Sequence, residues 1–124
     1  MPLDALPPGF ADILGPSGLL TGADMEAHLA DWRGLYRGQA MAVLRPASTE
    51  QVAACVRLCA QQGIRIFPQG GNTSMVGGAT PQDAPRQVVL SLARMNRVLE
   101  VDVADMTMTV EAGAVLADVQ KAAA

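Results

Sequence analysis

A glycine-rich loop from Pro68 to Pro81, PQGGNTSMVGGATP, is the stretch of the sequence best suited to bind a ligand. It contains four glycines and no charged side chain. Glycine tolerates positive φ and lets the backbone approach a ligand closely, so successive N–H groups can turn toward an anion. Asn72, Thr73 and Ser74 add side-chain donors. The loop is therefore predicted to form a neutral cradle for a diphosphate, held mainly by backbone amides.

Two common phosphate-binding motifs are absent from this loop. No Lys-Ser or Lys-Thr pair follows a second glycine, as a Walker A loop requires, and there is no G-x-G-x-x-G fingerprint. The residues alone leave two interpretations open. The loop either binds a diphosphate or is a turn that only joins two elements.

Strand and helix patterns before the loop predict its place in a sheet. Residues 40–46 resemble a strand ended by Pro46, residues 48–63 a helix opened by a Ser48–Gln51 capping box and closed by Gly63, and residues 64–68 a second strand. This is a βαβ unit with parallel strands and a right-handed crossover. The loop would follow the carboxyl end of the second strand, where open α/β sheets bind ligands.

Further strands follow the loop, which makes the expected fold α/β (α+β). Strands are predicted at 87–92, 97–103 and 106–113, with a turn at 93–96. Met106, Met108 and Val110 are expected on one packed face of the last strand. A helix begins near residue 114 and meets no stop signal, so the domain is expected to be incomplete at its C-terminus.

The residues before the βαβ unit are expected to form an irregular lead-in of about twenty residues and then a helix. Residues 21–36 place Met25, Leu29, Trp32 and Tyr36 at helical spacing. His28 is the only histidine and lies beside this stripe. It has no catalytic partner in view, so we interpret it as a surface or packing residue rather than a base.

Composition excludes several classes of protein. The 124 residues suit one domain, and the net charge of -3 with scattered basic residues argues against nucleic-acid binding. No metal site is expected. The opening residues lack the basic region of a signal peptide, and no apolar run reaches membrane-spanning length, so we expect a cytoplasmic protein without a transmembrane segment.

The two cysteines lie in the helix predicted at 48–63. Cys55 and Cys59 are four residues apart and therefore share one face of that helix. We interpret them as small core residues, packed with Val52 and Val56 on the buried face.

Four motifs, in order, resemble the FAD-binding domain of the vanillyl-alcohol oxidase and p-cresol methylhydroxylase (PCMH-type) superfamily. They are RPASTEQV, PQGGNTSMVGGATP, VVLSLARMNRVLEVD and TVEAG. Within that superfamily they are most similar to the FAD-dependent D-2-hydroxyacid dehydrogenases, which include D-2-hydroxyglutarate and D-lactate dehydrogenases and the glycolate oxidase flavin subunit. The resemblance divides the chain into a lead-in and helix, residues 1–37, and the N-terminal part of the FAD-binding domain, residues 38–124.

The resemblance implies cofactor-binding roles for three groups of residues. The loop residues Gln69, Gly70, Gly71, Asn72, Thr73 and Ser74 would surround the FAD diphosphate, and Gly77 and Gly78 would let the loop pass close to it. Ala112 and Gly113 match a segment that lies against the cofactor, and Pro46 matches a proline near the adenine end.

Two positions of the loop bear on how FAD is held. Some relatives attach flavin to a histidine directly after the paired glycines, and Asn72 stands there in this chain, so non-covalent FAD is implied. Ser74 stands where close relatives commonly have glycine. Its Cβ is tolerable if φ is negative or if its hydroxyl finds a phosphate.

The resemblance implies an oxidoreductase that oxidises a D-2-hydroxy acid to the 2-oxo acid by hydride transfer to flavin. Electrons would pass to a quinone, a cytochrome or an electron-transfer flavoprotein. The activity would belong to a longer chain, and residues 1–124 alone are expected to be inactive, with no catalytic residue among them. The alternatives are another oxidase of the same superfamily or a non-catalytic nucleotide-binding module.

Overall fold

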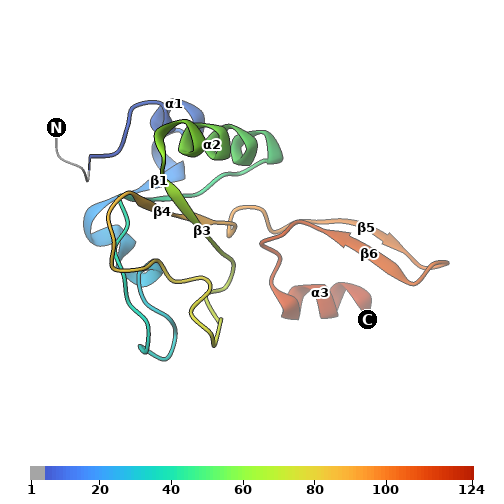
Figure 1. The fold of residues 1–124 in the computed structure, drawn as a ribbon. Helices are drawn as coiled ribbons and strands as arrows, with labels where there is room; N and C mark the ends of the chain where they lie inside the picture. The colour runs from blue at the N-terminus through green and yellow to red at the C-terminus, as the bar shows by residue number, and fades with distance from the viewer. Residues whose placement is uncertain (1–4) are drawn as a thin grey trace.

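The computed structural model describes residues 5–124 and has the mixed α/β fold expected from the sequence (Figure 1). A βαβ unit is followed by further strands, as predicted. The elements of the described residues are α1 (Phe10–Leu14), η1 (Pro16–Gly18), β1 (Leu19–Leu20), η2 (Gly22–His28), β2 (Ala42–Leu44), α2 (Thr49–Gln62), β3 (Arg65–Gln69), β4 (Gln87–Ser91), β5 (Val98–Asp102), β6 (Thr107–Val110) and α3 (Leu116–Ala123), where η marks a 3-10 helix.

Helix α2 begins and ends where its sequence signals predict. The Ser48 hydroxyl accepts a hydrogen bond from the Gln51 N–H at 3.2 Å, and Gln51 Oε1 accepts one from the Ala47 N–H at 2.7 Å. Gly63 ends the helix with a φ of 65°, in the left-handed region that glycine adopts without a Cβ clash. These caps fix the length of the connection between β2 and β3.

The main sheet has the strand order β1-β2-β4-β3. β1 is antiparallel to β2, whereas β2 and β3 are both parallel to β4. The two strands of the βαβ unit are therefore parallel, as expected, although β4 lies between them. Because all three parallel strands point the same way, the residues that follow them emerge at one edge of the sheet.

The two faces of this sheet are covered differently. One face packs against α1 and α2 through alternate residues of β2, β3 and β4, namely Ala42, Leu44, Ile66, Val88 and Leu90. Val43 and Val89 alternate with these residues and are fully buried as well. Two loops, residues 29–38 and 70–80, lie on the side of the sheet away from the helices (Figure 1).

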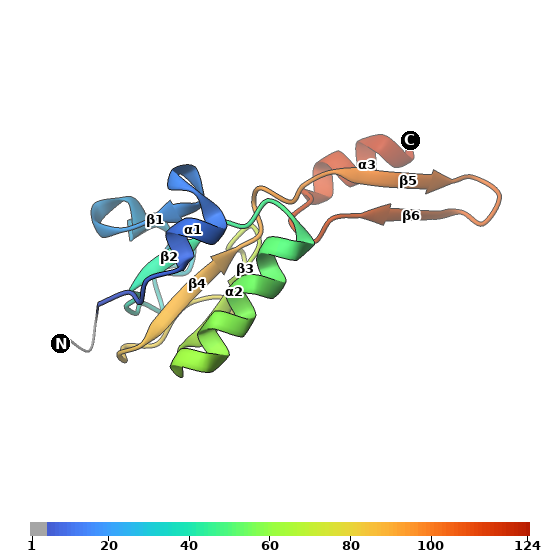
Figure 2. The same ribbon diagram turned by 90° about the horizontal axis from the view of Figure 1, so that it is seen from above.

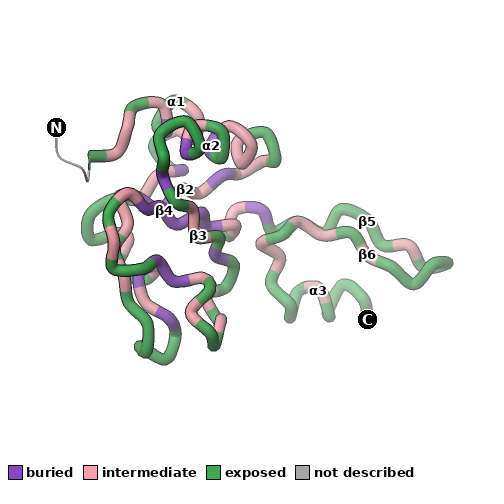
Figure 3. Tube along the Cα trace, in the orientation of Figure 1, coloured by how far each residue is buried: buried purple, intermediate pink, exposed green. Residues whose placement is uncertain are grey.

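The β5–β6 hairpin and α3 project away from the main sheet (Figure 2). Most of their residues are exposed, in contrast to β2 and β4 (Figure 3). The expectation that Met106 packs within a strand is wrong, because it precedes β6 with a φ of 55° and is 91% exposed. Residues 103–106 form the turn between β5 and β6, and Met106 is its left-handed residue.

The helix expected from Thr21 to Tyr36 is also wrong. Only Gly22–His28 is helical, as a 3-10 helix, and the chain then turns back on itself. Gly34 has a φ of 70°, which an α-helix cannot contain, and Trp32 is 60% exposed rather than packed. The apolar spacing was helical, but non-local contacts decided the conformation.

The cysteines of α2 are core residues, as the sequence indicated. Cys55 and Cys59 are fully buried free thiols. Burial, together with the neighbouring Cys55, raises the pKa of Cys59 to about 11. The expected burial of Val56 is wrong, since it is 43% exposed at the edge of that face.

Among the described residues, no helix is long and apolar enough to cross a membrane. Residues 5–124 also contain no group of three or more His, Cys, Asp or Glu side chains arranged to hold a metal ion.

Candidate functional site

The glycine-rich loop begins where β3 ends, and a buried glutamine anchors its base. Gln69, the last residue of β3, is 2% exposed. Its Nε2 donates to the carbonyls of Ala79 at 3.0 Å and His28 at 3.1 Å. Its Oε1 accepts from His28 Nδ1 at 2.7 Å, so Nδ1 carries the proton. The bond to Ala79 brings the two ends of the loop together.

Asn72 connects the loop to the segment that precedes the sheet. Its Nδ2 donates to the carbonyl of Ala30 at 2.8 Å and to that of Ala27 at 3.4 Å. Its φ is 57°, a left-handed conformation that asparagine adopts more readily than most residues. The side-chain donor predicted to bind the diphosphate is therefore already hydrogen-bonded to backbone carbonyls of the chain. Of the donors of Asn72, its backbone N–H remains unpaired within the described residues.

The backbone donors of the first half of the loop are free. Within residues 5–124, the N–H groups of residues 70–75 donate to no protein acceptor. The next N–H, of Val76, reaches the Ser74 hydroxyl at 3.4 Å, and that of Thr80 reaches the Gly77 carbonyl at 3.2 Å. A run of adjacent unpaired donors is the feature that an oxyanion ligand requires.

Three of the four glycines leave open space at the loop. A Cβ built on Gly70 or Gly78 meets no atom within 4 Å, and one on Gly71 meets only Thr73 Cγ2 at 4.0 Å. The folded chain itself thus does not need glycine there. Gly77 differs, because its φ is 79° and a Cβ would lie 3.2 Å from the Tyr36 ring.

The departure from the family pattern at Ser74 is accommodated by the backbone. Ser74 is not among the residues with positive φ, so its Cβ is not strained. Its hydroxyl accepts the bond from Val76 noted above, which leaves the hydroxyl proton available as a donor.

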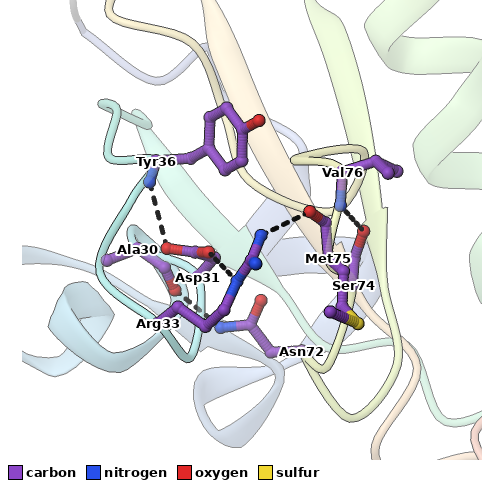
Figure 4. A network of polar contacts seen from close by, with 8 residues as sticks. All are labelled: Ala30, Asp31, Arg33, Tyr36, Asn72, Ser74, Met75 and Val76. Carbon is purple, nitrogen blue, oxygen red and sulfur yellow. Dashed lines mark hydrogen bonds and ion pairs between the residues drawn. The ribbon is translucent and has the colours of Figure 1, made fainter.

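A charged network from the preceding segment reaches the tip of the loop (Figure 4). Arg33 Nη2 donates to the carbonyl of Met75 at 2.5 Å, and Arg33 Nε lies 3.8 Å from Asp31 Oδ2. Asp31 Oδ1 accepts from the Tyr36 N–H at 3.0 Å. The loop itself carries no charged side chain, as the sequence indicates, but the guanidinium of Arg33 binds it at the Met75 carbonyl.

The second predicted cofactor segment meets the base of the loop at Leu92. The Leu92 N–H donates to the carbonyl of Gln69 at 2.9 Å. The carbonyl group of the same residue faces Gly113, where an added Cβ would lie only 1.7 Å from the Leu92 carbonyl oxygen. Gly113 is therefore required by the close approach of two backbones in the fold itself, and it also donates its N–H to Met95 at 2.8 Å.

Ala112 lines a cavity of about 460 Å³ at the start of α2. No residue of the glycine-rich loop lines it, so the cavity does not join the two predicted segments. Pro46, expected near the adenine end, is fully buried. Hydrogen bonds from the side chain and N–H of Arg97 hold the pKa of Glu111, beside Ala112, below its usual range.

The sequence did not indicate the residues that support the loop from outside. Asp31, Arg33 and Tyr36 all lie in the range 21–36, for which the sequence predicts a helix, and only Tyr36 is placed on its apolar stripe. His28 is a packing residue, as interpreted, but its partner Gln69 is 41 residues away. No local pattern could have identified these contacts, since they depend on how the segment before the sheet folds back.

Comparison with known sequences supports a flavin site. The family model described as "FAD binding domain" matches residues 40–124. The chain is 39% identical over 93 residues to the mitochondrial D-2-hydroxyglutarate dehydrogenase of Bos taurus, covering 75% of this chain and 17% of that protein. It is 38% identical over 101 residues to the D-2-hydroxyglutarate dehydrogenase of Xanthomonas citri, covering 82% and 21%.

A mitochondrial protein of Schizosaccharomyces pombe, whose name proposes a D-lactate dehydrogenase, is 35% identical over 115 residues, covering 86% of this chain and 22% of that protein. The chain thus spans about a fifth of the length of the curated relatives it matches.

Solved structures share this fold. An alkyldihydroxyacetonephosphate synthase aligns with a TM-score of 0.79 at 26% identity, covering 94% of this chain and 24% of that one. p-Cresol methylhydroxylase with substrate bound aligns with a TM-score of 0.74 at 26% identity, covering 91% and 22%.

Proposed function

The chain belongs to the FAD binding domain family, and from this premise we propose that its glycine-rich loop holds the diphosphate of FAD. The observation that carries the proposal is the run of unpaired N–H donors at residues 70–75. A diphosphate offers acceptor oxygens for such donors, and its charge needs no lysine when several amides point at it.

The roles of individual residues follow from this assignment. We propose that the backbone N–H groups of Gly70, Gly71 and Asn72 bind the diphosphate. The backbone N–H and side-chain hydroxyl groups of Thr73 and Ser74 would bind it as well. The open space at Gly70, Gly71 and Gly78 supports a close approach of the cofactor, since a Cβ at these positions would project into it.

For the other predicted cofactor-binding residues, we propose only where they lie relative to the cofactor or how they support the loop. Gln69 is buried and acts by closing the loop, not by contact with phosphate. Gly77, with its positive φ and no Cβ, lets the loop turn back close to the Tyr36 ring. Ala112 and Gly113 are proposed to lie against the cofactor, and Pro46, being buried, to support the adenine end from inside.

We propose non-covalent attachment of FAD. Asn72 occupies the position where some members of the superfamily carry the flavin-linked histidine, and an amide forms no such bond. Acid precipitation of the flavoprotein should leave the flavin in the supernatant. Flavin that stays with the precipitate would contradict this part of the proposal.

For the whole protein we propose oxidation of a D-2-hydroxy acid to the 2-oxo acid. The names of the relatives support this class of substrate, and bound FAD would supply the two-electron acceptor. This chain contributes cofactor binding. The electron acceptor is proposed to be a quinone, a cytochrome or an electron-transfer flavoprotein.

The absorption spectrum of the protein purified from the complete reading frame tests the proposal. Flavin bands that bleach without oxygen on addition of D-2-hydroxyglutarate or D-lactate are the expected result. Bands that persist with both acids would favour another oxidase of the superfamily. A folded protein without bands would favour a non-catalytic nucleotide-binding module and overturn the assignment of the loop.

Two coarser expectations also remain proposals. The boundary between the lead-in, residues 1–37, and the FAD-binding domain, residues 38–124, could be tested by limited proteolysis. A cytoplasmic location could be tested by cell fractionation, and several relatives named as mitochondrial provide the competing outcome.

A further inference from the structure

The segment from residue 27 to residue 38, here called the collar, lies outside the range matched by the family model and contacts the glycine-rich loop along its length. Backbone hydrogen bonds between its two ends close the collar into a loop. The Gly38 N–H donates to the Leu29 carbonyl at 2.9 Å, and the Asp31 N–H donates to the Tyr36 carbonyl at 3.0 Å. Figure 1 shows it beside the loop.

Arg33 lies in the collar, with its guanidinium near Asp31, the Trp32 ring and the Met75 carbonyl. The Asp31 side chain is 1% exposed, and its Oδ2 lies 3.8 Å from Arg33 Nε, a contact longer than a hydrogen bond. The Trp32 ring centroid lies 5.8 Å from Arg33 Cζ, a cation–π distance. These neighbours restrict the positions open to the guanidinium, and its Nη2 donates to the Met75 carbonyl, 42 residues along the chain.

The tip of the glycine-rich loop has few other restraints. Met75 and Val76 are 59% and 82% exposed. Within residues 5–124, the Arg33 bond is the only hydrogen bond from residues 73–76 to any part of the chain outside the loop. The base of the loop is fixed at Gln69 and Asn72, so Arg33 restrains the part that these two residues do not reach.

We infer that Arg33 is a positioning residue for the FAD-binding loop, which it orders through the Met75 carbonyl before the cofactor binds. The inference rests on the proposed function of the loop. An ordered loop loses less conformational entropy on binding than a free one, so the bond should strengthen FAD binding without contact between Arg33 and the phosphates.

The test uses the protein from the complete reading frame, freed of cofactor, with the variants Arg33→Met and Arg33→Lys. The rate of thermolysin cleavage between Met75 and the exposed Val76, followed by mass spectrometry, measures loop order in the absence of FAD. Quenching of flavin fluorescence measures the FAD dissociation constant. R33M should speed cleavage and raise the dissociation constant about tenfold, and R33K should recover part of both.

Two further variants separate this effect from others. Arg37→Met removes another guanidinium of the collar, which pairs with Glu26 in η2, and it should change neither measurement. R33M also leaves the Asp31 carboxylate without its counter-charge. The double variant Asp31→Asn with Arg33→Met removes that charge and should behave like R33M.

The possible outcomes are distinct. Unchanged cleavage in R33M, or faster cleavage with unchanged FAD affinity, would overturn the role of Arg33. An effect that disappears in the double variant would also overturn it, because the unpaired Asp31 would then be the cause. A wild-type protein that fails to bind FAD would instead overturn the proposed function, and the cleavage experiment on the cofactor-free protein would still decide whether Arg33 orders the loop.

Discussion

His28 and Gln69 form a reciprocal pair of hydrogen bonds across 41 residues of chain. The His28 Nδ1–H donates to Gln69 Oε1 at 2.7 Å, and Gln69 Nε2 donates back to the His28 carbonyl at 3.1 Å. Because Gln69 directly precedes Gly70, this pair fixes the point from which the diphosphate loop leaves the sheet. It also ties the lead-in segment to the site.

The Gln69 side chain should therefore be needed for stability. Gln69→Leu leaves the carbonyls of His28 and Ala79 and the imidazole N–H without partners in a partly buried place. We expect a loss of about 2–3 kcal/mol in the free energy of unfolding, together with weaker FAD binding. Urea denaturation of the cofactor-free protein measures the first effect.

The matched control is Gln61→Leu, since Gln61 is exposed on α2. It should change the stability by less than about 0.5 kcal/mol. Equal unfolding midpoints for the two variants would show that the hydrogen bonds of Gln69 contribute nothing.

Gly71→Val should separate cofactor binding from folding. Its Cβ meets only Thr73 Cγ2 at 4.0 Å, so the fold should tolerate the change. The branched side chain would project toward the proposed cofactor. We expect FAD affinity to fall about 100-fold, equivalent to about 2.8 kcal/mol, with an unchanged melting temperature of the cofactor-free protein. Flavin content after purification gives a direct reading.

Gly63→Ala provides the opposite control. Gly63 has a φ of 65° at the end of α2, away from the loop, so alanine should lower stability by about 1 kcal/mol and leave FAD affinity unchanged. Full flavin occupancy in Gly71→Val would refute the assignment of the loop.

The sequence predicted best those elements whose signals are local. Ser48, Gln51 and Gly63 define α2 through contacts within a few residues, and the order of strands along the chain follows from apolar patterns. The loop was placed correctly after β3 for the same reason.

Predictions failed where distant parts of the chain decide the conformation. The apolar residues from 21 to 36 have helical spacing, but Ala30, Arg33 and Tyr36 are used by contacts with the glycine-rich loop. The position of β4 between β2 and β3 is likewise set by pairing across the sheet. The donor assigned to Asn72 turned inward because a carbonyl of the collar lies within reach, which no local pattern reveals.

Gly113 should tolerate no side chain. A Cβ there would lie 1.7 Å from the Leu92 carbonyl oxygen and 2.9 Å from that of Met95, both backbone atoms that cannot move independently. Gly113→Ala should therefore lower the free energy of unfolding by about 3 kcal/mol. Thermal melting of the cofactor-free protein measures the loss.

Ala114→Ser, at the next position, is a small change without this clash and should melt near the wild type. A Gly113→Ala variant as stable as the wild type would contradict the close approach of the two backbones.

The pair between Arg97 and Glu111, at the base of the β5–β6 hairpin, should make the stability of the protein depend on pH. Its carboxylate accepts hydrogen bonds from Arg97 Nε at 2.7 Å and from the Arg97 N–H at 3.0 Å. These bonds hold the pKa of Glu111 below its usual range. A carboxyl whose pKa is lowered by folding stabilises the protein above its unfolded pKa of about 4.3, and this contribution is lost as pH falls through the lower folded value.

We therefore expect the melting temperature of the wild type to fall more steeply below about pH 4.3 than that of Glu111→Gln, which cannot lose this charge. Glu100→Gln, on the exposed strand β5, is the matched control and should keep the wild-type slope. The difference between wild type and Glu111→Gln should be largest near neutral pH, where the carboxylate is fully charged. Parallel melting curves for the two proteins across this pH range would mean that the Arg97–Glu111 pair does not stabilise the fold.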